Sequence, residues 1–251
     1  MGNKLFFKSS LRFKTFVFLF FYCSVQTLIA QNHRNEIWVG YINSVNIKDR
    51  WYFWNDYHYV PESFALYRLG LTYETKAGYR ITNGYAQVWT ASPNSTALTR
   101  AEHRYWGQII KNFKWSERIR HNARFRYDLR FREPLDVNGD VIKRTYLLNY
   151  RWRVSNNIRF KITNPEDGKF FHVDVMNETL YNTGKHLNNG IDQIRNYVLL
   201  GYTNPKFTIL TGYSNRFFPN SQGPWRMNHG ITLWVAHRLS WNRFRGDEDI
   251  L

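Results

Sequence analysis

Residues 118–133 read RIRHNARFRYDLRFRE. Alternate positions hold six arginines, from Arg118 to Arg132, and the positions between them are mostly apolar or aromatic, as at Phe125 and Tyr127. Successive side chains of an extended strand point to opposite faces, so this spacing predicts one strand with a cationic face and an apolar face. Helical geometry would scatter the arginines around the cylinder and leave no apolar stripe.

The same alternation recurs along residues 36–240. One such strand alone would fit a soluble sheet, with the apolar face on a core and the arginines in water. Repetition favours a different arrangement, because no helical segment is left to cover so much aromatic surface. A closed barrel in lipid, aromatic-rich outside and polar and basic inside, accounts for all segments together. We predict an all-β chain, a single closed antiparallel transmembrane β-barrel of about 10–12 strands.

Composition supports strands rather than membrane helices. Phe, Trp and Tyr make up 18% of the 251 residues, yet the mean hydropathy is negative. This combination suits a sheet that alternates aromatic with polar side chains and argues against a helical membrane protein.

The first thirty residues read as a secretory signal peptide cleaved after Ala30. A basic segment without acids precedes the apolar run 15–22, and a small residue precedes Gln31. The alternative is a membrane anchor, but the apolar run is shorter than the ~20 residues that a span needs. Cleavage would also remove Cys23, the only cysteine, so we expect no disulfide. A short polar lead (31–35) would precede the barrel, and a charged tail (241–251) would follow it.

The formal net charge is +16, and removing the four cations of the signal peptide leaves +12. Nucleic acid is the usual partner of so basic a chain, but export and the spread of the cations along strands argue against it. We expect the partners to be outer-membrane lipid and lipopolysaccharide, together with small anionic solutes. The oligomeric state stays open.

Eleven strands are expected, or twelve if residues 158–163 form a strand of their own. A turn is expected at 155–157, and longer loops at 91–100, 134–143, 182–190 and 219–224. Long loops that alternate with short turns are typical of outer-membrane barrels. An even barrel with both ends in the periplasm would place the short turns outside, so the strand parity remains open.

The inward face is expected to carry a basic ladder and acidic partners. The ladder comprises Arg104, Arg118, Arg120, Arg124, Arg126, Arg130, Arg132, Arg151 and Arg153, and the acids are Glu74, Glu102, Asp128, Asp174 and Glu178. One interpretation is that the guanidiniums favour anions in the lumen. The other is that they form ion pairs that fill a narrow barrel. The two interpretations are compatible.

The sequence gives little support for a catalytic site or a metal-binding site. His172, Asp174 and Glu178 share one face, but their spacing spreads them over ~20 Å of strand. Ser44 and Ser214 lie in no recognisable nucleophile motif. We therefore expect no catalytic residues, no metal and no cofactor, although enzymatic activity is left open.

The strand Glu102-Xaa-Arg104-Xaa-Trp106-Xaa-Gln108, the Arg-Xaa-Arg ladder and the repeated Trp/Tyr strands resemble DUF2490, a family of uncharacterised outer-membrane barrel proteins found widely in Bacteroidetes. The likeness covers most of residues 36–240. It implies a location in the bacterial outer membrane and a barrel architecture, but no activity and no site residues.

These observations lead to one main expectation and two alternatives. We expect an outer-membrane barrel that acts as a small pore or as a structural or binding barrel with an anion-friendly, arginine-lined lumen. The first alternative is an outer-membrane barrel enzyme acting on lipid or lipopolysaccharide. The second is a soluble periplasmic β-protein that binds an acidic ligand.

Overall fold

The computed structural model describes residues 32–185, 190–219 and 224–240. The signal peptide (1–30) and the charged tail (241–251) expected above lie outside these residues. No helix in the part of the chain described here is long and apolar enough to cross a membrane.

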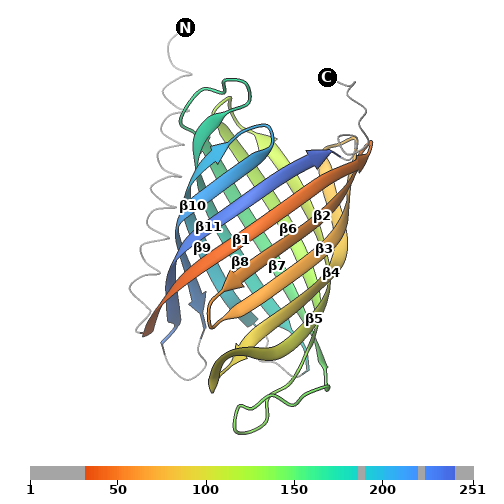
Figure 1. Ribbon diagram of the computed structural model, residues 1–251, viewed down its shortest axis with the longest axis vertical. Helices are drawn as coiled ribbons and strands as arrows, with labels where there is room; N and C mark the ends of the chain where they lie inside the picture. Colours follow the sequence, from red (N-terminus) through yellow and green to blue (C-terminus); the bar gives the residue numbers. More distant parts are fainter. Residues whose placement is uncertain (1–31, 186–189, 220–223, 241–251) are drawn as a thin grey trace.

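Eleven strands form within the described residues and close into one barrel in sequence order (Figure 1). They are β1 (Asn32–Lys48), β2 (Trp51–Val60), β3 (Phe64–Glu74), β4 (Tyr79–Ser92), β5 (Ser95–Lys114), β6 (Ile119–Arg132), β7 (Leu147–Lys161), β8 (Phe170–Thr183), β9 (Gly190–Thr203), β10 (Phe207–Phe218) and β11 (Arg226–Ser240). The prediction of an all-β closed barrel of 10–12 strands is confirmed.

The barrel closes through a parallel pairing. Strands β1 and β11 pair in parallel from Asn32↔Arg226 to Asn46↔Ser240, whereas the other ten neighbouring pairs are antiparallel. The expectation of a wholly antiparallel barrel is therefore wrong at this junction. With an odd number of strands that alternate in direction, the first and the last must run the same way.

Strand β7 corrects the turn expected at residues 155–157. The strand continues through these residues to Lys161, and Asn157 pairs with Asn122 on β6 and Met176 on β8. Asparagine favours turns only where the backbone lacks better hydrogen bonds, and here both neighbouring strands supply them. Residues 158–161 extend β7 and form no strand of their own.

The expected loop at 91–100 is also wrong. Strand β4 runs to Ser92 and β5 begins at Ser95, so only Pro93 and Asn94 lie between them. Threonine tolerates a strand well, which lets the Ser/Thr-rich sequence continue the sheet. A long connection does follow β6, where residues 133–146 include an isolated bridge between Leu135 and Val141.

The two faces of the central strands differ in chemistry. Along β7, Tyr150, Trp152 and Val154 are exposed on the outside, whereas Arg151 and Arg153 are buried inside. The same alternation holds across β6, as the sequence pattern of residues 118–133 predicts. On β6 and β7, large apolar side chains therefore point away from the lumen, and guanidiniums point into it.

Candidate functional site

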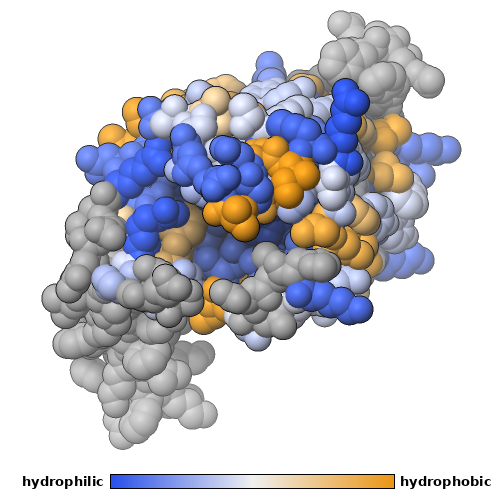
Figure 2. Space-filling view, turned by 90° about the horizontal axis from the view of Figure 1, so that it is seen from below, coloured by the Kyte–Doolittle hydropathy of each residue, from blue (hydrophilic) through white to orange (hydrophobic). Residues whose placement is uncertain are grey.

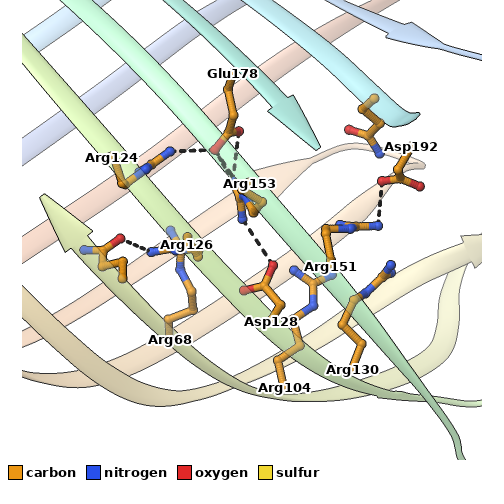
Figure 3. Close-up of polar contacts among 12 residues, drawn as sticks. Arg68, Arg104, Arg124, Arg126, Asp128, Arg130, Arg151, Arg153, Glu178 and Asp192 are labelled. Atoms are coloured by element: carbon orange, nitrogen blue, oxygen red, sulfur yellow. Dashed lines mark hydrogen bonds and ion pairs between the residues drawn. The ribbon is translucent and has the colours of Figure 1, made fainter. Parts of the chain in front are cut away.

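Seven of the nine predicted ladder arginines lie in the barrel interior, and Figure 3 shows most of them converging from β5, β6 and β7. They are Arg104, Arg124, Arg126, Arg130, Arg132, Arg151 and Arg153. Arg118 and Arg120 are exposed at the end of the barrel where β6 begins, and Arg118 donates to Asn164 (3.1 Å). The predicted ladder is therefore too long at this end, because the alternation continues beyond the enclosed part of the lumen.

Glu102 on β5 holds a cluster of three arginines. Arg130 donates to it from Nε (2.6 Å) and from a terminal nitrogen (2.8 Å), and Arg104 also pairs with it. Arg132 lies 3.4 Å from its second oxygen. Glu102 is completely buried. A buried carboxylate needs such partners, because the dielectric constant inside a protein is low and an unpaired charge there is energetically costly.

Glu178 on β8 holds the second cluster, near mid-barrel (Figure 3). Arg153 on β7 donates to both of its oxygens (2.7 and 2.9 Å), and Arg124 reaches it from β6 (2.6 Å). Arg195 on β9 approaches from the other side at 3.3 Å. Three strands thus direct guanidiniums at one carboxylate, which places positive charge in excess around it.

The remaining predicted acids have separate surroundings. Asp174 accepts two hydrogen bonds from Arg159 and one from His172, each 2.8 Å, while Asp128 lies 3.6 Å from Arg153. Glu74 is half exposed and lies 3.9 Å from Arg80, so it belongs to the rim rather than to the lumen.

The candidate metal ligands His172 and Glu178 and the candidate nucleophile Ser214 are engaged in hydrogen bonds or ion pairs with neighbouring side chains. His172 bonds to Asp174 and Thr203, whereas Glu178 serves the arginine cluster. Within the described ranges, no group of three or more His, Cys, Asp and Glu side chains is placed to hold a metal ion. The hydroxyl of Ser214 accepts a hydrogen bond from Thr232 (2.9 Å).

Several interior charges were not selected from the sequence. Asp56 on β2 pairs with Arg68 on β3 (Nε to Oδ1 2.8 Å), and Arg216 on β10 pairs with Glu36 on β1 (Nε to Oε2 2.8 Å). Asp192 on β9 pairs with Arg151 on β7, across the intervening strand β8 (2.7 Å). Inward alternation within each strand was a usable signal for these residues. Their partners depend on cross-strand register, which the alternation does not specify.

Aromatic rings in the lumen hold further guanidiniums. The guanidinium carbons of Arg195 and Arg216 lie 5.3 and 5.5 Å from the ring centre of Trp38. Arg126 lies 4.4 Å from the ring of Trp106 and donates to Gln108. Within the described residues, no carboxylate pairs with Arg126. Cation–π contacts of this kind stabilise a desolvated cation by ~2 kcal/mol, so at Arg126 an aromatic face takes the place of an anion.

A cavity of about 400 Å³ occupies the half of the lumen nearer the beginning of β1. Of the described residues that line it, eleven are arginines and four carry carboxylates, namely Glu36, Asp56, Glu178 and Asp192. The remaining lining includes Trp38, Trp54 and other aromatic side chains. Arginines therefore outnumber carboxylates in the lining of this cavity.

Figure 2 views the molecule from the end where β1 begins and shows a hollow with a hydrophilic interior. The far half of the lumen is different. There Thr72 and Thr82 share a hydrogen bond (2.8 Å), and Thr203 bonds to Thr208 (2.9 Å) and His172 (3.0 Å). These groups are fully or nearly fully buried. The lumen therefore combines an arginine-rich cavity with a far half in which neutral hydrogen-bonded groups lie beside the Arg159–Asp174 ion pair.

At the cavity end of the barrel, Glu133 links β5 to the connection that follows β6. Glu133 directly follows β6 and is buried. Its carboxylate accepts hydrogen bonds from the backbone N–H of Ala101 (2.9 Å) and Arg144 (3.1 Å) and lies 3.4 Å from Lys143 Nζ. Burial by itself would raise the pKa of Glu133, but these three donors outweigh it and hold the pKa below its usual value.

Comparisons with known proteins give one match. The model of the family described as "Protein of unknown function (DUF2490)" matches residues 35–228, which span β1 to the beginning of β11. No curated protein and no solved structure matched the chain. The family match covers most of the barrel, including both arginine clusters and all described residues that line the cavity except Arg34 and Trp234. The chain therefore belongs to the DUF2490 family of proteins of unknown function.

Proposed function

We propose that this chain is an outer-membrane β-barrel that binds small anionic solutes in a one-ended lumen cavity. The observation that carries this proposal is the lining of that cavity, in which eleven arginines face four carboxylates. Glu62, Glu102 and Asp128 pair with lining arginines from outside this lining, and with them the arginines still outnumber the carboxylates by eleven to seven. A set of ion pairs built only to fill the barrel would balance its charges. A bound anion would offset that excess and gain charge-assisted hydrogen bonds.

Support for the membrane placement comes from the outer face. Large apolar side chains stand exposed around the barrel, including Ile37, Tyr57, Val154 and Ile231, the last 63% exposed. Contiguous apolar surface of this kind is rare on soluble monomers, and lipid is its natural solvent. The signal peptide expected at residues 1–30 agrees with export to the outer membrane.

Support for binding over open transport comes from the lumen itself. The Glu178 cluster joins side chains from β6, β7, β8 and β9, and hydrogen-bonded residues fill the far half. A barrel of eleven strands is near the size that side chains can fill. A cavity of about 400 Å³ also lies within the range of small-molecule sites.

The membrane placement is tested by gel migration of the purified protein with and without heating, together with its need for detergent. A folded outer-membrane barrel migrates differently before and after boiling and precipitates without detergent. A chain that remains soluble and monodisperse without detergent would contradict the placement.

Anion binding is tested by the thermal unfolding midpoint in detergent. Phosphate and citrate should raise the midpoint above that in chloride of equal ionic strength, and varied organic cations should not. A ligand at 100 times its dissociation constant stabilises by about 2.7 kcal/mol. Equal midpoints in all anions would overturn the proposal. Planar-bilayer recordings distinguish a pore from a closed binding barrel. A pore would give stepwise conductance with anion-selective reversal potentials, and a closed barrel would give no conductance.

A further inference from the structure

One side of the cavity is apolar. Most of the large apolar residues that line it come from five adjacent strands, β11, β1, β2, β3 and β4. Six of them define what we call the apolar wall, namely Trp38, Trp54, Phe64, Leu66, Val88 and Trp234. These side chains pack in two neighbouring clusters that Phe64 joins. The wall is therefore a continuous aromatic and aliphatic surface.

The other side of the cavity carries most of its arginines. The three arginines around Glu102, the three around Glu178, and Arg151 all line the cavity, and we call these seven the arginine wall. They belong to β5, β6, β7 and β9, and Figure 3 shows several of them. The strand order places β5–β9 and β11–β4 in opposite halves of the closed barrel. A ligand in the cavity therefore meets aromatic rings on one side and guanidiniums on the other.

The positive excess of the cavity lies on the arginine wall. Its seven arginines share four carboxylates, namely Glu102, Asp128, Glu178 and Asp192. Of the other four lining arginines, three have one carboxylate each and the fourth lies over a ring. These contacts are Arg34 with Glu62, Arg68 with Asp56, Arg216 with Glu36, and Arg226 with Phe218. An anionic group bound in the cavity would therefore gain most from the arginine wall.

Trp234 presents apolar surface to the cavity. It lines the cavity, is only partly buried and, within the described residues, has no guanidinium over its ring. Its ring centre lies 5.5 Å from that of Trp38 and 5.1 Å from that of Tyr197. Gly40 on the neighbouring strand β1 makes room for it, because a Cβ there would lie 2.7 Å from Trp234 Cδ1. A ligand can therefore contact Trp234 without displacing an ion pair.

The apolar wall narrows the class of anion. Inorganic phosphate has no apolar surface, so it would bind the arginines and leave the opposite wall in contact with water. A ligand with an apolar body removes that surface from water as well, and ring-on-ring contacts add to the gain. Small-molecule sites generally combine such apolar linings with a few polar groups that fix the orientation of the ligand.

We propose that the ligand of this cavity is an amphipathic anion, an aromatic or other apolar body that carries a carboxylate or a phosphate. Its anionic group lies against the arginine wall and its body against the apolar wall. This inference rests on the proposed anion binding and specifies which anions the cavity prefers.

The test compares methyl phosphate with phenyl phosphate by calorimetry, at a pH where both are dianions. The detergent is nonionic, because an anionic detergent is itself an amphipathic anion. Phenyl phosphate should bind tighter by roughly tenfold or more, because its ring is buried against the apolar wall. Equal affinities would overturn this inference and leave anion binding in place. If neither phosphate binds, the proposed function falls as well.

Benzyl alcohol tests the arginine wall, because it has the ring without the charge. It should bind at least roughly tenfold more weakly than phenyl phosphate. Equally tight binding of the two would show that the ligand is held by its apolar body alone, which would overturn the proposal.

Variants of the apolar wall locate the preference. Trp234→Ala should remove most of the difference between the two phosphates, and Trp234→Phe should retain it. Phe64→Ala tests the same wall from β3. Trp152→Ala is the matched control, because Trp152 is exposed on the outer face of β7, and both affinities should stay unchanged. Heat-modifiable migration verifies that each variant is folded. A preference that persists in folded Trp234→Ala and Phe64→Ala would overturn the role of the apolar wall.

Discussion

Glu102 shows how one buried carboxylate organises several guanidiniums. Arg104, Arg130 and Arg132 all approach it, and each would otherwise repel the others in a medium of low dielectric constant. The carboxylate therefore gathers three guanidiniums at one point, one from β5 and two from β6. Loss of the Glu102 carboxylate would destabilise the fold more than loss of one ion pair, because it would leave several buried cations unpaired.

Glu102→Gln should destabilise the barrel by about 3–5 kcal/mol, because it removes one side of a buried ion-pair cluster. The urea midpoint for loss of heat-modifiable migration measures this change. Glu74→Gln is the control, since Glu74 is half exposed and its contact with Arg80 is long. That variant should change stability by less than about 1 kcal/mol. Equal effects of the two substitutions would contradict the proposed role of Glu102.

Glu133 makes the cavity rim sensitive to acid. Its pKa in the folded protein lies below the unfolded value, so its stabilising effect is complete above the unfolded pKa. The effect is lost as the pH falls through the folded pKa. Hydrogen–deuterium exchange of residues 133–146, corrected for intrinsic rates, should therefore accelerate at acidic pH. In Glu133→Gln the exchange should be fast already at neutral pH and should lose this pH dependence.

At the scale of whole strands, neighbouring hydrogen bonds override local preferences. Residues 155–157 carry a turn-like sequence, yet β6 and β8 extend β7 through them. The same effect shortens the connection between β4 and β5 to two residues. A strand flanked on both sides gains a ladder of hydrogen bonds that an isolated segment cannot have.

Strand β11 closes the barrel, because it pairs with β10 on one side and with β1 on the other. Leu233→Pro removes a backbone N–H in the middle of this strand, where Leu233 pairs with Val39 and Thr211. Proline is not tolerated inside a sheet, so the variant should lose heat-modifiable migration. Val137→Pro, in the exposed loop after β6, is the control and should fold. Normal folding of Leu233→Pro would show that β11 is not needed for closure.

For the molecule as a whole, the lumen separates charge along its length. The cavity half holds the arginine excess, while the far half holds neutral hydrogen-bonded groups and the Arg159–Asp174 ion pair. Anions entering from the cavity end would therefore meet a favourable field and then a filled wall. This asymmetry distinguishes a binding barrel from a channel that is open throughout.

The cavity mouth offers a direct test of this field. Arg226 lines the cavity, and its guanidinium lies 4.6 Å from the ring of Phe218. Arg226→Glu should weaken citrate binding roughly tenfold or more, because it replaces attraction with repulsion at the entrance. Arg120→Glu changes the net charge equally at the opposite, exposed end and should leave binding almost unchanged. Calorimetry in detergent measures both, and equal losses would indicate a general effect of net charge.

The sequence by itself determined the class of fold and the two faces of the strands, because alternation with period two is a local property of the chain. It also selected seven of the arginines that the barrel encloses. Tertiary structure decided the parallel closure of β1 on β11, the partners of each arginine and the boundaries of the cavity. These features depend on register between strands that are distant in sequence, and no pattern within one strand encodes that register.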